Sequence, residues 1–188
     1  MKIALTAPLR AGKSLAASYI SLHYDFQPFA FGDELKDAFH RAFPYIPRNP
    51  KPRAHYQEFG QWARKEFGED VWINALMPKI AAYLDRHPCE CGNNTLLKNR
   101  VIIDDCRQPN EYQRLKDEGF VFVRITAPVD LRIERAKKAG DQFEIADLEH
   151  PTELAVDSFE VDYEIENAGK PEELYAKLDA IIAEQLLV

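Results

Sequence analysis

The chain has 188 residues, of which 46% are hydrophobic and 29% charged, a balance typical of one soluble globular domain. Its 31 acidic residues outnumber its 24 basic residues and give a net charge of -7. An acidic chain is a poor candidate for broad nucleic-acid binding, which requires a basic surface, although a local basic cluster is enough to bind one nucleotide.

The sequence also argues against a secreted or membrane protein. No apolar run approaches the roughly 18 residues of a membrane span, and the first residues lead directly into a predicted strand, with no room for a signal peptide. Cys89, Cys91 and Cys106 fit a reducing compartment. Cys89 and Cys91, with His87 nearby, lack the spacing of a four-ligand zinc site, so a polar loop is the better interpretation. We expect a cytoplasmic protein that is a monomer or a homodimer.

The first part of the chain predicts a phosphate-binding loop. Residues 1–6 form an apolar strand pattern, and residues 15–20 suit the start of a helix. Between them, Ala7-Pro8-Leu9-Arg10-Ala11-Gly12-Lys13-Ser14 departs from the pattern G-x-x-x-x-G-K-[ST] only at Ala7. A chance match in an ordinary α/β unit is the alternative, but the strand–loop–helix context argues against it. Alanine at this position is compatible with the loop if its φ is negative.

The residue types of this loop suit a bound phosphate. Gly12 lets the backbone approach an anion without a side-chain penalty, and the following helix directs its positive end at the same anion. We expect Lys13 at the β- and γ-phosphates of ATP and Ser14 at Mg²⁺. Ala11 and Leu15 complete the predicted nucleotide-binding residues.

A second strand is predicted at residues 29–31, where Phe-Ala-Phe precedes Gly-Asp. Asp33 can cap the amphipathic helix predicted over 34–43. It can also present a carboxylate at the end of a parallel strand, where ligands bind in such sheets. The two roles are compatible, and Lys36 on the same helix is a candidate for substrate binding.

A proline-rich basic segment, 44–53, can be neither a helix nor a central strand and is predicted to be a loop. We assign Arg53 to an acceptor pocket and interpret Arg48 and Lys51 as solvated charges. Two helices are then expected, at 55–67 and from 71 to about 86. On the first, Gln57, Gln61 and Arg64 share one polar face that can line a cleft.

The run Val-Ile-Ile at 101–103 is the clearest buried strand, and it ends in Asp104 and Asp105. A carboxylate here would orient Mg²⁺ or its water shell, and Asp104 is the first choice because it directly follows the strand. The alternative is that turn-forming residues simply end the strand. Arg107, shortly after the strand, can reach a substrate phosphate.

The last third of the chain continues the alternation of helices and strands. Helices are predicted at 111–118, 128–138 and 171–187, and strands at 120–125 and 162–166. Arg132 and Arg135 can act from a mobile lid at about 130–152. The whole order predicts a single domain, 1–188, with a helical acceptor-side insertion at about 34–86. Its fold would be a three-layer α/β/α P-loop NTPase fold around a mostly parallel five-stranded sheet.

Five stretches over almost the whole chain carry a family resemblance: residues 7–14, 29–36, 67–76, 101–111 and 162–169. Together they resemble the deoxynucleoside monophosphate kinases among the P-loop kinases and, more distantly, dephospho-coenzyme A kinase and adenylate kinase. The resemblance implies ATP- and Mg²⁺-dependent phosphorylation of a nucleoside monophosphate. It implies that Lys13 and Ser14 hold donor phosphates and metal, that Arg107 holds the acceptor phosphate, and that Asp33 lies near the transferred group.

The sequence departs from the family pattern at the second motif as well as at Ala7. Asp104 lies one residue too far from Arg107 for the expected Asp-x-Arg spacing, whereas Asp105 fits it, so the choice of carboxylate stays open. Substrate binding is assigned to Asp33, Lys36, Arg53, Gln61, Arg64 and Arg107. A kinase of another small metabolite, and a protein that binds or hydrolyses nucleotide without an acceptor, are the alternatives.

Overall fold

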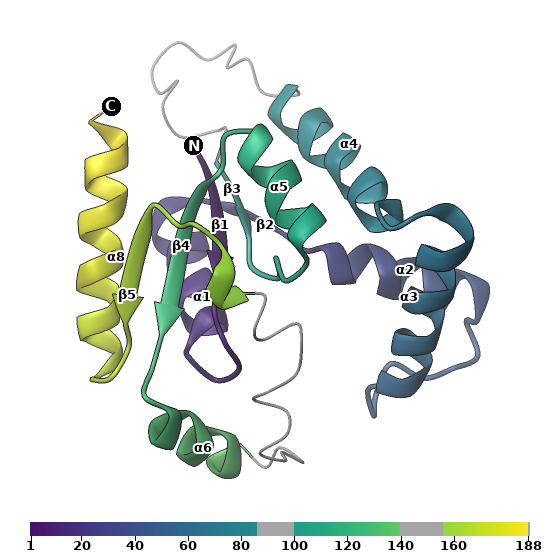
Figure 1. Cartoon of the computed structure of the whole chain (residues 1–188), viewed down its shortest axis with the longest axis horizontal. Coiled ribbons are helices and arrows are strands. Elements are labelled where there is room, and N and C mark those ends of the chain that lie inside the picture. The colour runs from purple at the N-terminus through teal and green to yellow at the C-terminus, as the bar shows by residue number, and fades with distance from the viewer. Residues whose placement is uncertain (86–99, 140–155, 188) are drawn as a thin grey trace.

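The computed structural model describes residues 1–85, 100–139 and 156–187, and its strands form one parallel sheet (Figure 1). The strand order is β2-β3-β1-β4-β5. The strands are β1 (Lys2–Thr6), β2 (Gln27–Phe29), β3 (Val101–Ile103), β4 (Val121–Thr126) and β5 (Tyr163–Glu166). The predicted five-stranded α/β fold is therefore confirmed.

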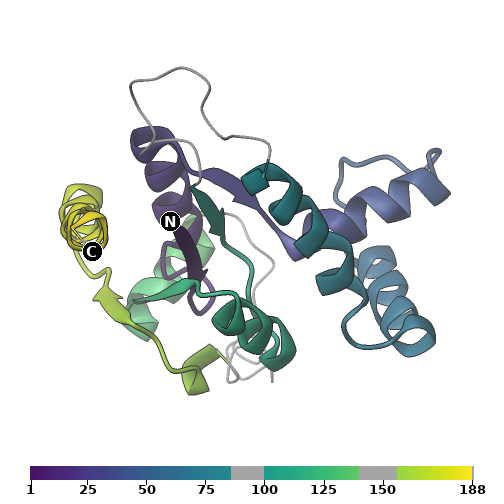
Figure 2. The same ribbon diagram turned by 90° about the horizontal axis from the view of Figure 1, so that it is seen from above.

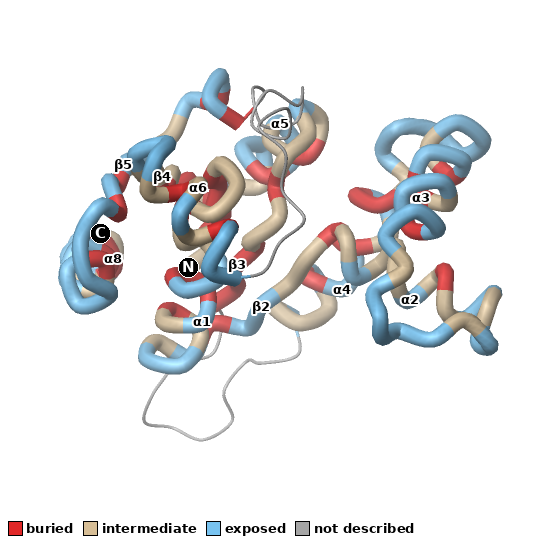
Figure 3. Tube along the Cα trace, turned by 90° about the horizontal axis from the view of Figure 1, so that it is seen from below, coloured by how far each residue is buried: buried red, intermediate tan, exposed pale blue. Residues whose placement is uncertain are grey.

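The side chains of β1 alternate between two cores, as expected for a strand covered on both faces. Ile3 and Leu5 pack into a core with α1 (Lys13–Tyr24) and α8 (Pro171–Leu186). Ala4, between them, faces the opposite core, to which α4 (Val71–Asp85) and α5 (Pro109–Asp117) contribute Leu76 and Leu115. Helices thus cover both faces of the sheet, and Figure 3 shows the buried residues gathered along the strands and the inner sides of the helices.

A helical body stands to one side of the sheet, at the end opposite α8 (Figures 1 and 2). It consists of α2 (Phe31–Ala42), α3 (Arg53–Phe67) and α4. Its residues cover the segment, about 34–86, for which a helical acceptor-side insertion is predicted. None of the helices in the described part of the chain is long and apolar enough to cross a membrane.

Helix α6 (Val129–Lys138) follows β4. It lies within the segment, about 130–152, for which a lid is predicted. Residues 140–155, the rest of that segment, lie outside the described residues, as do His87, Cys89 and Cys91.

The start of α2 differs from the prediction. Strand β2 occupies 27–29 rather than 29–31, and α2 begins at Phe31, so Asp33 lies in its first turn and is not its N-cap. The physical reason is a distant carboxylate. The backbone N–H groups of Phe31 and Gly32 donate to Asp105 at 2.9 and 2.7 Å. Asp105, at the end of β3, thereby does what a local capping residue would otherwise do.

Candidate functional site

The loop between β1 and α1 has the backbone that its glycine pattern predicts. Gly12 has a φ of 108° and Arg10 a φ of 61°, whereas Ala7 is not among the residues with a positive φ. Alanine is therefore compatible with the first position of the loop, where it is buried with only 4% exposure. Gly12 is required for a second reason, because a Cβ atom there would overlap the side-chain amide of Asn167.

Side chains from later segments of the chain donate hydrogen bonds to the backbone carbonyl oxygens of this loop. Asn167 Nδ2 donates to the carbonyl oxygen of Ala11 at 2.8 Å, and Arg132 Nε donates to that of Leu9 at 2.7 Å. Arg135 in turn donates to the carbonyl oxygen of Asn167 at 3.1 Å. Asn167 was not predicted as a site residue, because its turn-forming context gives no hint of a partner in the loop.

A cavity of about 790 Å³ lies over the loop. Gly12, Lys13, Ser14 and Leu15 line one part of it. Ala11, in the same loop, is buried and does not line the cavity. The cations on its other walls are Lys51, Arg53, Arg107 and Arg135. Arg132 is not among the lining residues. One buried guanidinium nitrogen of Arg132 and one of Arg135 have no hydrogen-bond partner among the described residues. Such groups suit an anionic ligand.

Lys13 lies in an electrostatic setting that favours a bound anion. Burial lowers the pKa of Lys13, and the nearby positive charge of Arg107 lowers it further. Asp104 and Asp105 act in the opposite direction. An anion between Lys13 and Arg107 would relieve both the desolvation and the repulsion of the two cations.

The two consecutive aspartates have different surroundings. Asp105 accepts the two N–H groups of α2, and burial raises its pKa in spite of them. Asp104 instead lines a cavity of about 480 Å³ together with Ser14 and Asp33. Over residues 1–85, 100–139 and 156–187, no group of three or more His, Cys, Asp or Glu side chains is arranged to hold a metal ion. Mg²⁺ suits such a site, since it is commonly bound by one or two protein ligands plus phosphates and water.

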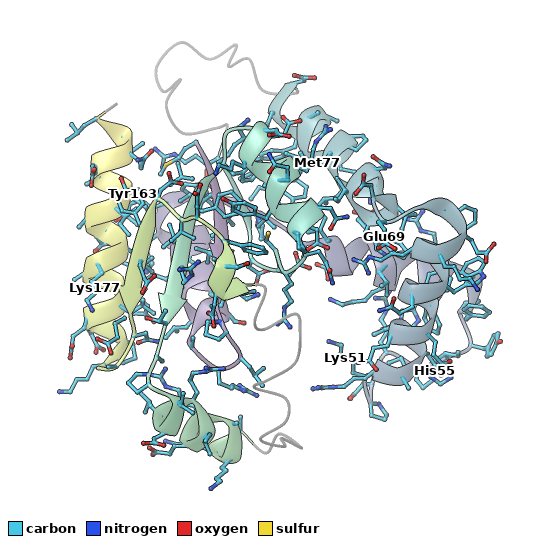
Figure 4. All side chains as sticks on the ribbon, viewed as in Figure 1. Lys51, His55, Glu69, Met77, Tyr163 and Lys177 are labelled. Atoms are coloured by element: carbon cyan, nitrogen blue, oxygen red, sulfur yellow. The ribbon has the colours of Figure 1, made fainter. Side chains whose placement is uncertain are left out.

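A further cavity of about 320 Å³ lies between α2 and α3. Three residues predicted to bind substrate, Lys36, Gln61 and Arg64, line it. Lys51 and Arg53 line both this cavity and the one over the phosphate loop. Figure 4 shows Lys51 on the side of the helical body that faces the sheet.

Lys51 is exposed to solvent, in keeping with its interpretation as a solvated charge, and it also lines both cavities. Burial lowers its pKa, and the charges of Lys36, Arg53 and Arg107 lower it further. Sequence alone could not reveal this cluster of Lys36, Lys51, Arg53 and Arg107, because its members come from three separate segments of the chain. Arg48 fits its interpretation, forming an exposed 3.4 Å ion pair with Asp37.

The turn that carries Arg107 is fixed by a buried carboxylate. Glu111 Oε2 accepts the backbone N–H groups of Arg107 and Gln108, each at 3.0 Å. Its other oxygen lies 3.3 Å from the guanidinium of Arg64. Glu111 was not predicted as a functional residue, although its spacing from Gln108 is that of a capping box. Asp33, by contrast, is exposed and forms a 2.5 Å ion pair with Lys36.

Comparisons with known proteins support the fold and leave the substrate open. No protein-family model matches the chain, and no curated protein matches it significantly. TT1252 from Thermus thermophilus is 18% identical with a TM-score of 0.59, covering 98% of this chain and 97% of its own. A shikimate kinase from Acinetobacter baumannii in complex with shikimate is 18% identical with a TM-score of 0.52, covering 98% and 93%. A gluconokinase from Sinorhizobium meliloti 1021 is 15% identical with a TM-score of 0.52, also covering 98% and 93%. The chain therefore shares the three-layer α/β fold of these structures.

Proposed function

We propose that this protein is an ATP- and Mg²⁺-dependent phosphotransferase that converts a nucleoside monophosphate, ribo- or deoxyribo-, into its diphosphate. The observation that carries the proposal is the position of Lys51 and Arg53, which line both the cavity over the phosphate loop and the cavity between α2 and α3. A cationic wall shared by two cavities suits two anionic substrates that meet there.

The donor nucleotide is assigned to the phosphate-loop cavity. The loop backbone at Gly12 and the start of α1 would bind its phosphates, with Lys13 as a point charge on them. Ser14 and Asp104, which both line the separate cavity of about 480 Å³, would hold the metal. Asp105 is less suited to this role because its carboxylate already accepts two backbone N–H groups. When bound, ATP supplies the phosphoryl group that is transferred.

The acceptor is assigned to the cavity between α2 and α3. Arg107 and Lys51 would bind its phosphate, while Gln61 and Arg64 would contact its uncharged part. A phosphate acceptor is already ionised near neutral pH, so no strong general base is needed. Asp33, held by Lys36, would lie near the transferred group. Catalysis then depends on positioning and on charge neutralisation by Lys13, Arg107 and Arg135, while Arg132 supports the loop through its hydrogen bond to Leu9.

A kinase whose acceptor is an uncharged polyol is the competing function. It would share the donor site, but it would not require the cluster formed by Lys36, Lys51, Arg53 and Arg107. That cluster favours an acceptor that carries its own negative charge.

The test measures ADP release with Mg-ATP alone and with each member of a panel of ribo- and deoxyribonucleoside monophosphates, the carboxylates shikimate and gluconate, and an uncharged polyol such as glycerol. We expect ADP only with a nucleoside monophosphate, together with one equivalent of the nucleoside diphosphate. ADP formation without an acceptor would identify a hydrolase. ATP binding with no turnover on any acceptor of the panel would contradict the proposal.

A further inference from the structure

We propose that Glu111 is a positioning residue that sets the affinity for the acceptor, because one buried carboxylate holds both Arg107 and Arg64. The inference rests on the proposed function, since it assigns these two arginines to the acceptor side. It concerns a residue that does not line the acceptor cavity. A substitution of Glu111 should therefore change the affinity for the acceptor only through Arg107 and Arg64.

The two oxygens of Glu111 have separate partners. Oε2 accepts the N–H groups of Arg107 and Gln108 at 3.0 Å each, which fixes the turn between β3 and α5. Oε1 accepts a hydrogen bond from the Arg64 guanidinium at 3.3 Å. Arg64 belongs to α3, in the helical body, so Glu111 links that body to the turn beside the phosphate loop.

The burial of this pair makes it sensitive to substitution. The side chains of Arg64 and Glu111 are only 18% and 5% exposed, so solvent screens their interaction weakly. Removal of one partner would leave the other charge partly buried and unpaired. Arg64 would then turn toward other acceptors or toward water, and its position in the acceptor cavity would change.

Glutamine at this position separates the two contacts. In Glu111→Gln, the remaining carbonyl oxygen can still accept the N–H groups of Arg107 and Gln108. The new amide NH₂ group faces the N–H groups of Arg64. Both are hydrogen-bond donors, so the hydrogen bond from Arg64 is lost. We therefore expect the KM for the nucleoside monophosphate to rise about tenfold or more, as for loss of a hydrogen bond to a charged group. The KM for ATP should stay within about twofold of the wild-type value, since α1 and the loop are not touched.

The matched control, Glu118, is the C-cap of the same helix. Glu118 pairs with Arg114 at 2.9 Å in a 38% and 49% exposed ion pair. Because exposed pairs contribute little, Glu118→Gln should leave both KM values unchanged. Glu111→Asp keeps the charge and should recover part of the affinity for the acceptor. Thermal unfolding of each variant shows whether a change in KM merely accompanies a loss of stability.

A double-mutant cycle with Arg64→Gln gives the decisive comparison. If Glu111 acts through Arg64, the double variant should have the acceptor KM of Arg64→Gln alone. The proposal would be overturned if the two substitutions raised the acceptor KM independently, so that their fold-changes multiplied in the double variant. A Glu111→Gln variant that is destabilised but has a normal acceptor KM would overturn it as well. If Glu111→Gln does not fold, the Glu111→Asp variant carries the same cycle. A wild-type protein without acceptor-dependent turnover refutes the proposed function, whereas an active one with an insensitive Glu111 refutes only this inference.

Discussion

Asn167 donates its side-chain N–H to the carbonyl oxygen of Ala11 at 2.8 Å, and so joins the segment after the last strand to the loop after the first. The residue is 5% exposed, and its amide fills the space that the missing side chain of Gly12 leaves. Its own carbonyl oxygen accepts a hydrogen bond from Arg135 on α6. Asn167 thus links the phosphate loop to α6, with its side-chain amide bonded to the loop and its backbone carbonyl oxygen bonded to Arg135.

Replacing Asn167 should therefore weaken nucleotide binding as well as stability. In Asn167→Asp, a carboxylate would face the carbonyl oxygen of Ala11 and would repel the phosphates. The loss of a buried donor should lower the free energy of unfolding by about 1–3 kcal/mol. Urea denaturation measures the stability, and calorimetric titration measures ATP binding. Unchanged ATP affinity in a folded variant would show that the contact does not shape the loop.

The two ends of the loop should respond in opposite ways to exchanges of glycine and alanine. Ala7→Gly restores the full pattern but should leave ATP binding unchanged, while lowering the free energy of unfolding by roughly 0.5–1 kcal/mol through chain entropy. Gly12→Ala should abolish ATP binding, because its φ of 108° disfavours a side chain and because the Cβ would overlap Asn167. Equilibrium binding of a fluorescent ATP analogue measures both. A clear gain in affinity in Ala7→Gly would mean that Ala7 impairs the native loop.

Lys13 should oppose stability while it supports activity. Burial and Arg107 lower its pKa below the ordinary 10.5, so the folded protein binds this proton less tightly than the unfolded chain does. The resulting penalty is fully present below the folded-state pKa, and it disappears as the pH rises from that value toward 10.5. Lys13→Met should therefore raise the Tm at pH 7 without nucleotide, by an amount that shrinks at alkaline pH, and it should abolish transfer.

Added Mg-ATP separates the two effects of that substitution. Ligand binding to the folded state raises the Tm of the wild-type protein, but it should not raise that of Lys13→Met. Turnover retained by the variant would remove the phosphate loop from the proposed reaction. A Tm below that of the wild-type protein at pH 7 would mean that the cation contributes to stability even without its ligand.

The neighbouring aspartates should give two different phenotypes. Asp105→Ala removes the carboxylate that accepts the N–H groups of Phe31 and Gly32, and should lower the free energy of unfolding by about 0.5–2 kcal/mol, as for loss of a helix cap. Asp104→Ala should leave stability nearly unchanged and should raise the Mg²⁺ concentration needed for half-maximal activity. Magnesium titrations beside chemical denaturation distinguish them. The reverse pattern would exchange the two assignments.

Lys51 and Arg48 offer a matched pair within one loop. Lys51→Ala should raise the KM for the nucleoside monophosphate by about tenfold, as for loss of one charge-assisted hydrogen bond. Arg48→Ala removes only an exposed ion pair with Asp37, and should change neither KM nor stability measurably. Steady-state kinetics at fixed saturating ATP provide the comparison. Equal effects of the two substitutions would indicate a general electrostatic field rather than a binding site.

The elements that the sequence predicted well are those with a local cause. The apolar strand at 1–6, the glycine loop and the helix behind it follow one another without a break, and the structure contains β1 and α1 there. The run at 101–103 is β3 with the same bounds. The alternation of strands and helices was sufficient to predict the parallel sheet, because crossovers of this kind allow few topologies.

The features that the sequence did not predict depend on partners far along the chain. Helix α2 begins at Phe31 because Asp105 caps it, and no local pattern contains that information. Lys51 lies in a proline-rich loop whose position becomes clear only when Lys36 and Arg107 are brought beside it. Glu111 had a visible capping signature, yet its ion pair with Arg64 spans two helices.

The central position of β1 has a consequence for the order in which the protein is assembled on the ribosome. Strand β1 pairs with β3 and β4, so it has to wait for its neighbours until residues 101–103 and 121–126 have been translated. The hydrogen bond from Asn167 to Ala11 forms later still. A nascent chain that ends before this asparagine carries the whole glycine motif without its final support. We expect nucleotide binding to begin only after Asn167 has been translated and has reached Ala11.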